Sequence, residues 1–208
     1  EELCHRQFGI GADGLIFITE PEGNNYAKMT IYNSDGSEAE MCGNGIRCLI
    51  EYLHMNDSTI SKSNEYKIET KAGIKIAHYS KGEITVKMGN PILDNTNIPT
   101  TINNKRGTIL SYHFNESSFD KEGFAIGMGN PHLVFFLDDL DSISVPLLGP
   151  LFENNKLFPE KTNVHFSQII NRDNIKVLVW ERGCGETLAC GTGACAVHVA
   201  AFKLGLCN

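Results

Sequence analysis

Two segments of this chain repeat one another 148 positions apart, and each centres on a cysteine followed by a Gly-x-Gly turn. Cys42 precedes Gly43-Asn44-Gly45, and Cys190 precedes Gly191-Thr192-Gly193. An apolar run typical of a strand lies upstream of each cysteine, and a stretch typical of a helix follows it. The repeat therefore predicts two similar halves, each presenting one thiol at the start of a helix.

The frame of the repeat extends beyond the cysteines. Asn33 stands at the position of Glu181, and Glu38 stands at the position of Glu186. Two similar halves can place two thiols so that they face each other, which suits proton transfer on both sides of one carbon. The repeat therefore favours an epimerase or a racemase.

The turn itself suits an anionic ligand and a reactive thiol. The first backbone N–H groups of a helix lack partners, and the helix dipole favours negative charge there. Glycines on both sides of Asn44 and Thr192 let the backbone approach a bound carboxylate. A cysteine at this position is expected to have a lowered pKa, so its thiolate can act as a base. Since cysteine is often simply buried, one copy alone would indicate packing, and two copies in register favour chemistry.

Composition narrows the class of protein. With 208 residues, 41% hydrophobic and 21% charged, the chain is typical of a globular protein of one large or two small domains. The net charge of −7, without a basic stripe, argues against nucleic acid as a partner. No apolar run approaches the roughly 18 residues of a membrane helix, so no membrane partner is expected. Seven cysteines without an even, closely spaced pattern favour a reducing compartment.

The periodicity predicts many short strands and few helices. We expect strands at residues 15–18, 29–32, 66–70, 74–79, 84–88, 108–114, 124–128, 133–137, 163–168 and 175–180. One helix is expected at residues 42–55, and a second begins at Cys190; the second is apolar nearly all round, so it is expected to be buried. Residues 91–105 show no periodicity and are the expected crossover between domains.

Several motifs, taken together and in order, resemble the diaminopimelate epimerase family. They are His5-Arg6-Gln7-Phe8-Gly9-Ile10-Gly11-Ala12-Asp13-Gly14, Asn33-Ser34-Asp35-Gly36-Ser37-Glu38, Met41-Cys42-Gly43-Asn44-Gly45, Gly129-Asn130-Pro131-His132, Thr162-Asn163, Glu181-Arg182-Gly183-Cys184-Gly185-Glu186-Thr187 and Ala189-Cys190-Gly191-Thr192-Gly193. The resemblance covers essentially the whole chain.

This resemblance implies an α+β fold of two pseudo-symmetric domains, each a curled mixed sheet around a central helix, with the active site in the cleft between them. The halves would be residues 1–93, with Cys42, and 94–208, with Cys190. It also implies a cofactor-independent isomerase that interconverts LL- and meso-diaminopimelate in lysine and peptidoglycan precursor synthesis. A cytoplasmic or plastid-stromal location and a homodimer are expected.

The resemblance also assigns roles to individual residues. Cys42 and Cys190 would be the acid/base pair, with His132 and Glu181 beside them to tune the thiols. The substrate would be bound by the residues Asn33, Gly43, Asn44, Asn130, Asn163, Glu181, Arg182, Gly191 and Thr192. No metal ligand is expected. The family's N-terminal Gly-x-Gly-Asn-Asp-Phe loop and its closing strands are not found here, so we expect the chain to be a fragment of a longer protein.

Two alternatives remain open from the residues. A zinc module could use Cys42 with Cys48 and Cys184 with Cys190, although a spacing of six is longer than the usual knuckle of two to four. A proline racemase also carries two cysteines, but usually has histidine where Asn44 stands and lacks the Glu181-Arg182 pair. The five remaining histidines, His54, His78, His113, His165 and His198, share no spacing.

Overall fold

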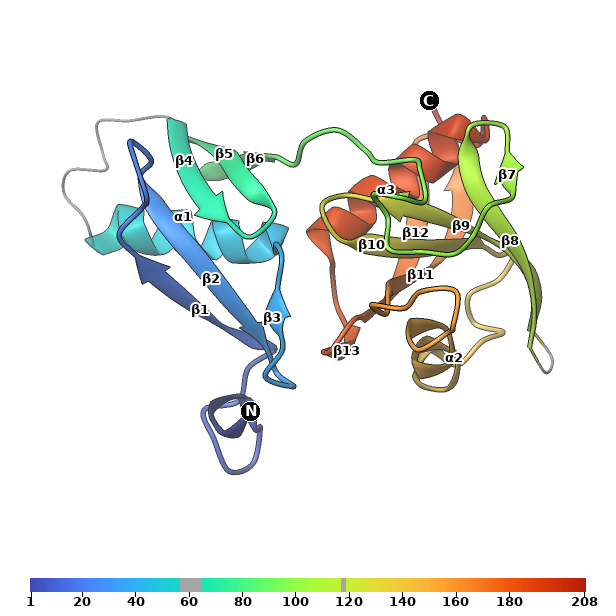
Figure 1. Ribbon diagram of the computed structural model, residues 1–208, viewed down its shortest axis with the longest axis horizontal. Helices are drawn as coiled ribbons and strands as arrows, with labels where there is room; N and C mark the ends of the chain where they lie inside the picture. The colour runs from blue at the N-terminus through green and yellow to red at the C-terminus, as the bar shows by residue number, and fades with distance from the viewer. Residues whose placement is uncertain (57–64, 117–118) are drawn as a thin grey trace. The chain divides into compact units, whose positions relative to one another are not determined.

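The computed structural model describes residues 1–56, 65–116 and 119–208. The chain forms two compact units, Glu1–Gly89 and Asn90–Asn208, each with a mixed β-sheet and a helix that starts after a cysteine (Figure 1). The α+β fold class expected from the sequence is confirmed. The expected crossover segment joins the second unit: Ile92 exchanges two backbone hydrogen bonds with Gly127 (2.8 and 2.9 Å), and Ile98 and Ile102 are buried in that unit's core.

The first unit is a sheet with one long helix. Its elements are a 3-10 turn (Glu2–Cys4), β1 (Gly14–Thr19), β2 (Ala27–Asn33), β3 (Glu38–Ala39), α1 (Gly43–Asn56), β4 (Glu65–Thr70), β5 (Gly73–Ser80) and β6 (Glu83–Lys87). The strand order is β1-β2-β4-β5-β6, with β3 paired to β2. Only the β2–β4 pair is parallel, because the chain passes through α1 between these strands.

The helix α1 forms because its apolar residues recur on one face. Ile46, Leu49 and Ile50 are fully or nearly fully buried, and they pack with Met29 of β2 and Ile68 of β4 in one hydrophobic cluster. A stripe of this kind, spaced three and four residues apart, is the pattern of a helix lying on a sheet. Packing of this face fixes α1, and therefore the cysteine turn at its start, against the sheet.

The second unit is a longer sheet with two helices. Its elements are β7 (Lys105–Arg106), β8 (Ile109–Glu116), β9 (Phe119–Gly127), β10 (Pro131–Phe136), α2 (Val145–Glu153), β11 (Asn163–Asn171), β12 (Asn174–Glu181), β13 (Gly185–Thr187) and α3 (Gly191–Lys203). The strands follow one another across the sheet in reverse chain order, from β13 to β7. β10 and β11 are parallel, with α2 in the connection between them.

The two helices of this unit cover opposite faces of its sheet. Trp180 is paired with Val164, whereas Val179 is paired with His165, so Trp180 and His165 point to opposite faces. Gly149 of α2 lies against the Trp180 indole, and Gly193 of α3 lies against the His165 imidazole. The Trp180 face holds an aromatic core that includes the buried rings of Phe114, Phe119, Phe135, Phe152 and Phe166.

Two expectations about helices need correction. The helix α2 was not predicted, because Pro146, Gly149 and Pro150 all lower helix propensity; it forms through packing on the sheet. The expectation that α3 is buried all round is wrong. Its buried face includes Ala196 and Ala200, but Phe202 is 56% exposed, since α3 packs on only one face of strands β9 to β11.

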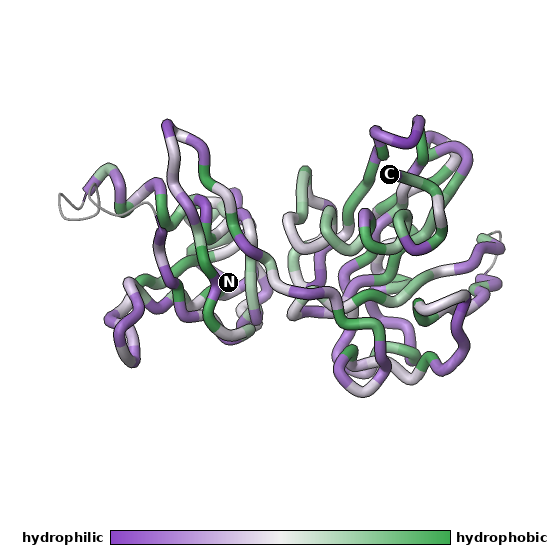
Figure 2. The backbone as a smooth tube through the Cα atoms, turned by 90° about the horizontal axis from the view of Figure 1, so that it is seen from above, coloured by the Kyte–Doolittle hydropathy of each residue, from purple (hydrophilic) through white to green (hydrophobic). Residues whose placement is uncertain are grey.

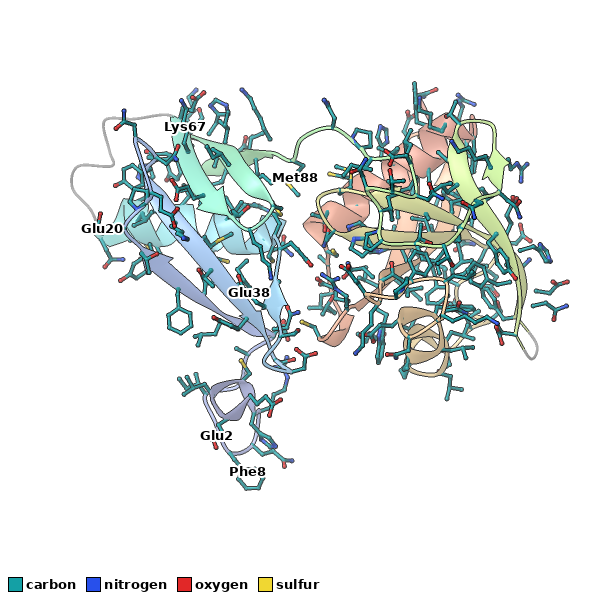
Figure 3. All side chains as sticks on the ribbon, viewed as in Figure 1. Glu2, Phe8, Glu20, Glu38, Lys67 and Met88 are labelled. Carbon is teal, nitrogen blue, oxygen red and sulfur yellow. The ribbon has the colours of Figure 1, made fainter. Side chains whose placement is uncertain are left out.

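Hydropathy follows these elements, with hydrophobic stretches in strands and helices and mostly hydrophilic turns (Figure 2). Within the described ranges, no helix combines the length and apolar character needed to cross a membrane. The N-terminal loop of the first unit leaves an aromatic side chain unburied: Phe8 is 87% exposed to solvent (Figure 3).

Candidate active site

The sequence repeat corresponds to a repeated substructure. β2 ends at Asn33 and β12 ends at Glu181, each at the last residue of a hairpin's second strand. A short strand then pairs back in the same register, with Tyr32 opposite Glu38 in one unit and Trp180 opposite Glu186 in the other. The next helices begin at Gly43 and Gly191. The predicted correspondence of Asn33 with Glu181 and of Glu38 with Glu186 is confirmed.

The Cys42 sulfur lies at the start of α1. The backbone N–H of Gly45 donates to Cys42 Sγ at 3.3 Å, and the N–H of Ile46 donates to the Cys42 carbonyl at 3.0 Å. Cys42 thus acts as a side-chain cap, with its sulfur accepting one of the N–H groups that a helix leaves unpaired. The side chain is half-buried, with Gly43 buried and Asn44 half-buried beside it.

Cys190 repeats this geometry in a more enclosed setting. It is the N-cap of α3, and its Sγ accepts the backbone N–H of Gly193 at 3.3 Å. Thr192 Oγ1 lies 3.3 Å from the same sulfur. Cys190 is 8% exposed and Thr192 is 2% exposed, while Gly191 is half-buried. The Gly193 N–H therefore donates to the sulfur and favours negative charge there, and the Thr192 hydroxyl lies where it can donate as well.

The second glycine of the turn has much less room for a side chain in the second unit than in the first. A Cβ added at Gly193 would lie 2.1 Å from His165 Cε1 and 2.7 Å from Nε2, well inside van der Waals contact. A Cβ added at Gly45 would lie 3.1 Å from the end of the Ile16 side chain. The second unit therefore has a buried imidazole pressed directly beneath its cysteine turn, where the first unit has aliphatic side chains.

A hydrogen-bonded row of side chains leads away from Cys190. Asn130 Nδ2 donates to Thr192 Oγ1 at 3.4 Å, and Asn130 Oδ1 lies 2.8 Å from His132 Nε2. His132 Nδ1 lies 2.8 Å from His165 Nε2. Both imidazoles are completely buried. The structure therefore brings together three residues expected in the site, Asn130, His132 and Thr192, and adds His165 behind them.

Burial keeps both histidines neutral. Desolvation, then the charges of His165 and Arg182, hold the pKa of His132 well below its usual value. Desolvation lowers the pKa of His165 to about 3. Neither ring is therefore a cation near neutral pH. Each has one N–H donor and one bare nitrogen acceptor.

The end of β12 holds a second group of expected residues. Asn163 uses its amide within the protein: Nδ2 donates to the Pro131 carbonyl at 2.9 Å, and Oδ1 accepts the Arg182 backbone N–H at 3.1 Å. Glu181 Oε1 accepts the Thr187 hydroxyl at 2.5 Å. Asn163 therefore positions Arg182, and its direct contact with a substrate stays a prediction.

The Arg182 side chain and Asn33 have local partners as well. Arg182 Nη1 donates to the Glu160 carbonyl at 3.1 Å. Asn33 Nδ2 donates to Ser37 Oγ at 3.1 Å, and the backbone of Asn33 closes the turn between β2 and β3. Both side chains lie in turns that directly precede a cysteine segment, as the repeat predicts.

Two buried residues that bear on this region were not singled out from the sequence. His165 was grouped with histidines of no common spacing, yet it packs under α3. Glu153 of α2 is 6% exposed; its carboxylate accepts Trp180 Nε1 at 2.7 Å and the Gly183 N–H at 3.0 Å, with Lys161 Nζ at 3.9 Å. Glu153 thereby ties the turn after β12 to α2.

A metal could find one set of donors among the described residues. The ligand atoms of His132, His165 and Cys190 lie within 4.8 Å of one another. Two imidazoles and a thiolate are a donor set that zinc uses. His132 Nδ1 and His165 Nε2 are instead hydrogen-bonded to each other at 2.8 Å, so these residues are not assigned as metal ligands. This set differs from the cysteine pairs considered from the sequence, and the expectation of no metal stays a prediction.

Comparison with known proteins identifies the family. The sequence model of diaminopimelate epimerase matches residues 1–93 and 124–208. The chain belongs to the diaminopimelate epimerase family. It is 48% identical over 206 residues to the diaminopimelate epimerase of Prochlorococcus marinus (strain NATL2A), which covers 99% of this chain and 72% of that protein. It is 47% identical over 208 residues to the diaminopimelate epimerase of Brachyspira hyodysenteriae (strain ATCC 49526 / WA1), covering 98% of this chain and 73% of that protein.

Solved structures of other epimerases share the fold. A hydroxyproline epimerase from Agrobacterium vitis, with bound trans-4-hydroxy-L-proline, superposes with a TM-score of 0.68 at 14% identity, covering all of this chain and 65% of that one. A predicted epimerase from Pseudomonas aeruginosa gives a TM-score of 0.60 at 12% identity, covering 93% of this chain and 68% of that one. The family membership of this chain therefore agrees with its fold.

Proposed function

We propose that this chain carries the catalytic machinery of a diaminopimelate epimerase, interconverting the LL and meso isomers at one α-carbon. The repeated cysteine turn is the observation that supports this most directly. In each unit, the sulfur accepts a helix N-terminal N–H at 3.3 Å. The names of relatives 42–48% identical to this chain supply the substrate.

The reaction needs one thiolate and one thiol. In one direction, the thiolate of Cys42 or Cys190 takes the α-proton, an S–H bond forms, and the C–H electron pair stays on carbon. The other cysteine then gives its S–H proton to the opposite face and is left as a thiolate. The total number of protons on the enzyme is unchanged, and the two cysteines have exchanged roles. Such a cycle consumes no cofactor.

The surroundings of the two sulfurs differ, and this difference supports a different resting protonation state for each cysteine. Cys190 has the N–H of Gly193 and the hydroxyl of Thr192 within 3.3 Å, and these contacts act against its deeper burial, which by itself would favour the thiol. Donors that converge on a buried sulfur stabilise its anionic form over its protonated form. We therefore assign Cys190 as the resting thiolate and Cys42 as the resting thiol.

The remaining residues are proposed to hold the substrate. Backbone N–H groups of Gly43, Asn44, Gly191 and Thr192 would bind the carboxylate next to the reacting carbon, as helix N-termini bind anions. Asn33, Asn130, Asn163, Glu181 and Arg182 would bind the other polar groups. A guanidinium such as that of Arg182 can bind the distal carboxylate through two parallel hydrogen bonds.

The biological setting follows from the same proposal. The enzyme would act in lysine and peptidoglycan precursor synthesis, in the cytoplasm or a plastid stroma. A homodimer is proposed as its assembly. Size-exclusion chromatography with light scattering tests the last point, because a monomer mass of 23.0 kDa would contradict it.

The decisive experiment follows the α-proton. The protein is incubated with LL-diaminopimelate in deuterated water, and both deuterium incorporation and formation of the meso isomer are measured by NMR. We expect both with the parent chain and no meso isomer with Cys42→Ala or Cys190→Ala, since each variant lacks the base on one face. Cys48→Ser, on the exposed side of α1, is the matched control and should keep activity.

Two outcomes would contradict the proposal. Normal turnover by Cys42→Ala would exclude a two-base mechanism. Exchange of the α-proton of proline, without any of diaminopimelate, would assign the chain to a proline racemase. A halogenated substrate analogue adds a further check, because elimination requires only one base and should survive one of the two replacements.

A further inference from the structure

The row of side chains behind Cys190 has a definite direction. Asn130 Oδ1 can only accept, so His132 Nε2 carries the hydrogen of their 2.8 Å bond. His132 is neutral, so its Nδ1 is bare and accepts the hydrogen of His165 Nε2 across 2.8 Å. Each bond therefore donates toward Cys190, starting from His165.

The same direction continues to the sulfur. The Asn130 amide group donates from Nδ2 to Thr192 Oγ1. The Thr192 hydroxyl hydrogen is then free to donate to Cys190 Sγ, 3.3 Å away. The Gly193 N–H donates to the same sulfur. Every donor in the row thus points at Cys190, the arrangement that a thiolate requires and a thiol does not.

His165 determines this direction. In the direction described, its Nδ1 is a bare acceptor, and this atom is buried without a hydrogen-bond partner. If the row ran the other way, Nδ1 would instead be a buried N–H without an acceptor, a rarer and more costly condition. A reversed row would also direct the Thr192 hydroxyl hydrogen to Asn130, so that Thr192 could not donate it to the Cys190 sulfur. The unpartnered nitrogen of His165 therefore favours the row that ends in donors to sulfur.

We propose that His165 is a positioning residue that holds His132 in one tautomer and, through Asn130 and Thr192, directs hydrogen-bond donors onto the Cys190 sulfur. This inference deepens the proposed function, since it concerns one of the two proposed bases. Gly193 is part of the same device, because only a residue without Cβ lets the helix start sit on the His165 ring.

Other charged and titratable groups near this row of side chains have effects of their own. Arg182 disfavours a positive charge on His132. Glu181, at the same strand end, accepts the Thr187 hydroxyl. On α3 itself, burial raises the pKa of the Cys195 thiol, so this sulfur stays protonated and does not compete. The hydrogen-bond partner of His132 Nδ1 is His165 Nε2 at 2.8 Å, so a change at His165 acts on this bond directly.

The test compares two replacements of His165. His165→Gln can place an amide N–H near the position of Nε2 and so keep the donor to His132. His165→Leu fills the space without a donor. The reactivity of Cys190 toward iodoacetamide is measured from pH 5 to 10 by peptide mapping of the whole chain, with the Cys42 peptide in the same sample as internal reference. This readout does not require epimerase activity.

We expect His165→Leu to move the titration midpoint of Cys190 upward by about one pH unit, so that alkylation below the midpoint slows about tenfold. His165→Gln should keep the parent midpoint, and Cys42 should not change in either variant. If the Cys190 midpoint is the same in parent, His165→Leu and His165→Gln, His165 only fills space and the proposal is wrong. An equal shift in Cys42 would also overturn it, because it would indicate a general structural change.

The result of this titration test can be distinguished from the result of the epimerisation test of the proposed function. A shift in Cys190 alone, in a chain that does not epimerise diaminopimelate, would uphold the role of His165 and reject the proposed reaction. If His165→Leu does not fold, nitrogen-15 NMR of the parent histidines decides instead. The proposal requires a protonated Nε2 and a bare Nδ1 on both His132 and His165, and the opposite tautomers would refute it.

Discussion

Replacing Gly193 by alanine should strongly destabilise the second unit, whereas the same change at the equivalent Gly45 should not. The Cβ at position 193 would lie 2.1 Å from His165 Cε1, about 1.3 Å closer than the 3.4 Å at which ordinary contact begins. Neither the ring nor the start of α3 can shift so far without breaking the bond between His132 and His165.

The magnitude follows from these contacts. Overpacking a filled interior costs about 1–3 kcal/mol, and losing the imidazole hydrogen bond in a buried site adds about 1–3 kcal/mol. The better helix propensity of alanine offsets about 1 kcal/mol. We expect the free energy of unfolding of the second unit to fall by about 3 kcal/mol, the middle of a range of about 1–5 kcal/mol. At Gly45, the nearest atom is the mobile end of Ile16 at 3.1 Å, so the change should stay within about 1 kcal/mol.

The assay uses the only tryptophan of the chain. Trp180 lies in β12, so its fluorescence reports urea unfolding of the second unit. A loss of about 3 kcal/mol should lower the urea midpoint by about 1–2 M. For Gly45→Ala, far-UV circular dichroism reports both units, and the part of its transition that differs from the Trp180 transition is assigned to the first unit. An unchanged Trp180 midpoint in Gly193→Ala, or an equal loss in Gly45→Ala, would show that the imidazole does not press on the helix start as described.

Three further predictions concern charged and titratable groups. Arg182→Lys should raise the Michaelis constant for diaminopimelate more than it lowers kcat, because an ammonium cannot bind a carboxylate bidentately; steady-state kinetics test this. Glu153→Ala should lower the Trp180 urea midpoint by about 1–2 M, since it leaves the indole N–H buried without its acceptor, whereas Glu153→Gln keeps an acceptor and should lose less. The free energy of unfolding should fall as pH drops below about 6.5. In this range His132 and His165 become protonated in the unfolded chain but stay neutral in the folded chain, because burial lowers the pKa of both. Urea midpoints at pH 7, 6 and 5 measure this slope, and His165→Gln should flatten it.

The repeat made much of the site predictable. The match of Asn33 with Glu181 could be seen because a hairpin, a short strand and a helix start impose the same spacing in both units. The turn chemistry at each cysteine was also local, since it depends on a glycine three residues further along the chain. Features determined by adjacent residues were therefore accessible from the sequence.

His165 and Glu153 were not accessible for the opposite reason. β11 is buried on both faces at residues 163–167, so His165 lies in a strand without the polar-apolar alternation that marks an exposed face. Its partner His132 is on the neighbouring parallel strand β10, and α2 separates the two strands along the chain. Glu153 acquires its role by contact with Trp180, 27 residues away. Neither contact leaves a periodic trace in the sequence.

The helices show the same division between local and tertiary causes. α1 was predicted because its apolar stripe is regular, and the structure places that stripe in the core. α2 contains Gly149 where any side chain would collide with Trp180 at 2.3 Å. Gly149 therefore allows close packing on Trp180 but lowers the helix propensity of α2. A prediction from helix propensity alone misses a helix of this kind.

The position of β1 in its sheet has a consequence for handling this protein. β1 lies at the edge of the first sheet, and within the described residues it pairs with β2 on one side only. Residues Leu15 to Ile18 carry no charge, and Phe17 and Ile18 are 47% and 37% exposed. The outer strands of the second sheet are instead short: β7 is two basic residues long, Lys105–Arg106, and β13 is three residues long, Gly185–Thr187.

An apolar, uncharged edge is a template for another strand, while short or charged edges discourage such pairing. Aggregation of this chain in concentrated solution should therefore begin at the first unit and leave the second unit native. A lysine at position 17 would place a charge on the outward side of this edge. It would keep the chain monodisperse without touching either cysteine turn.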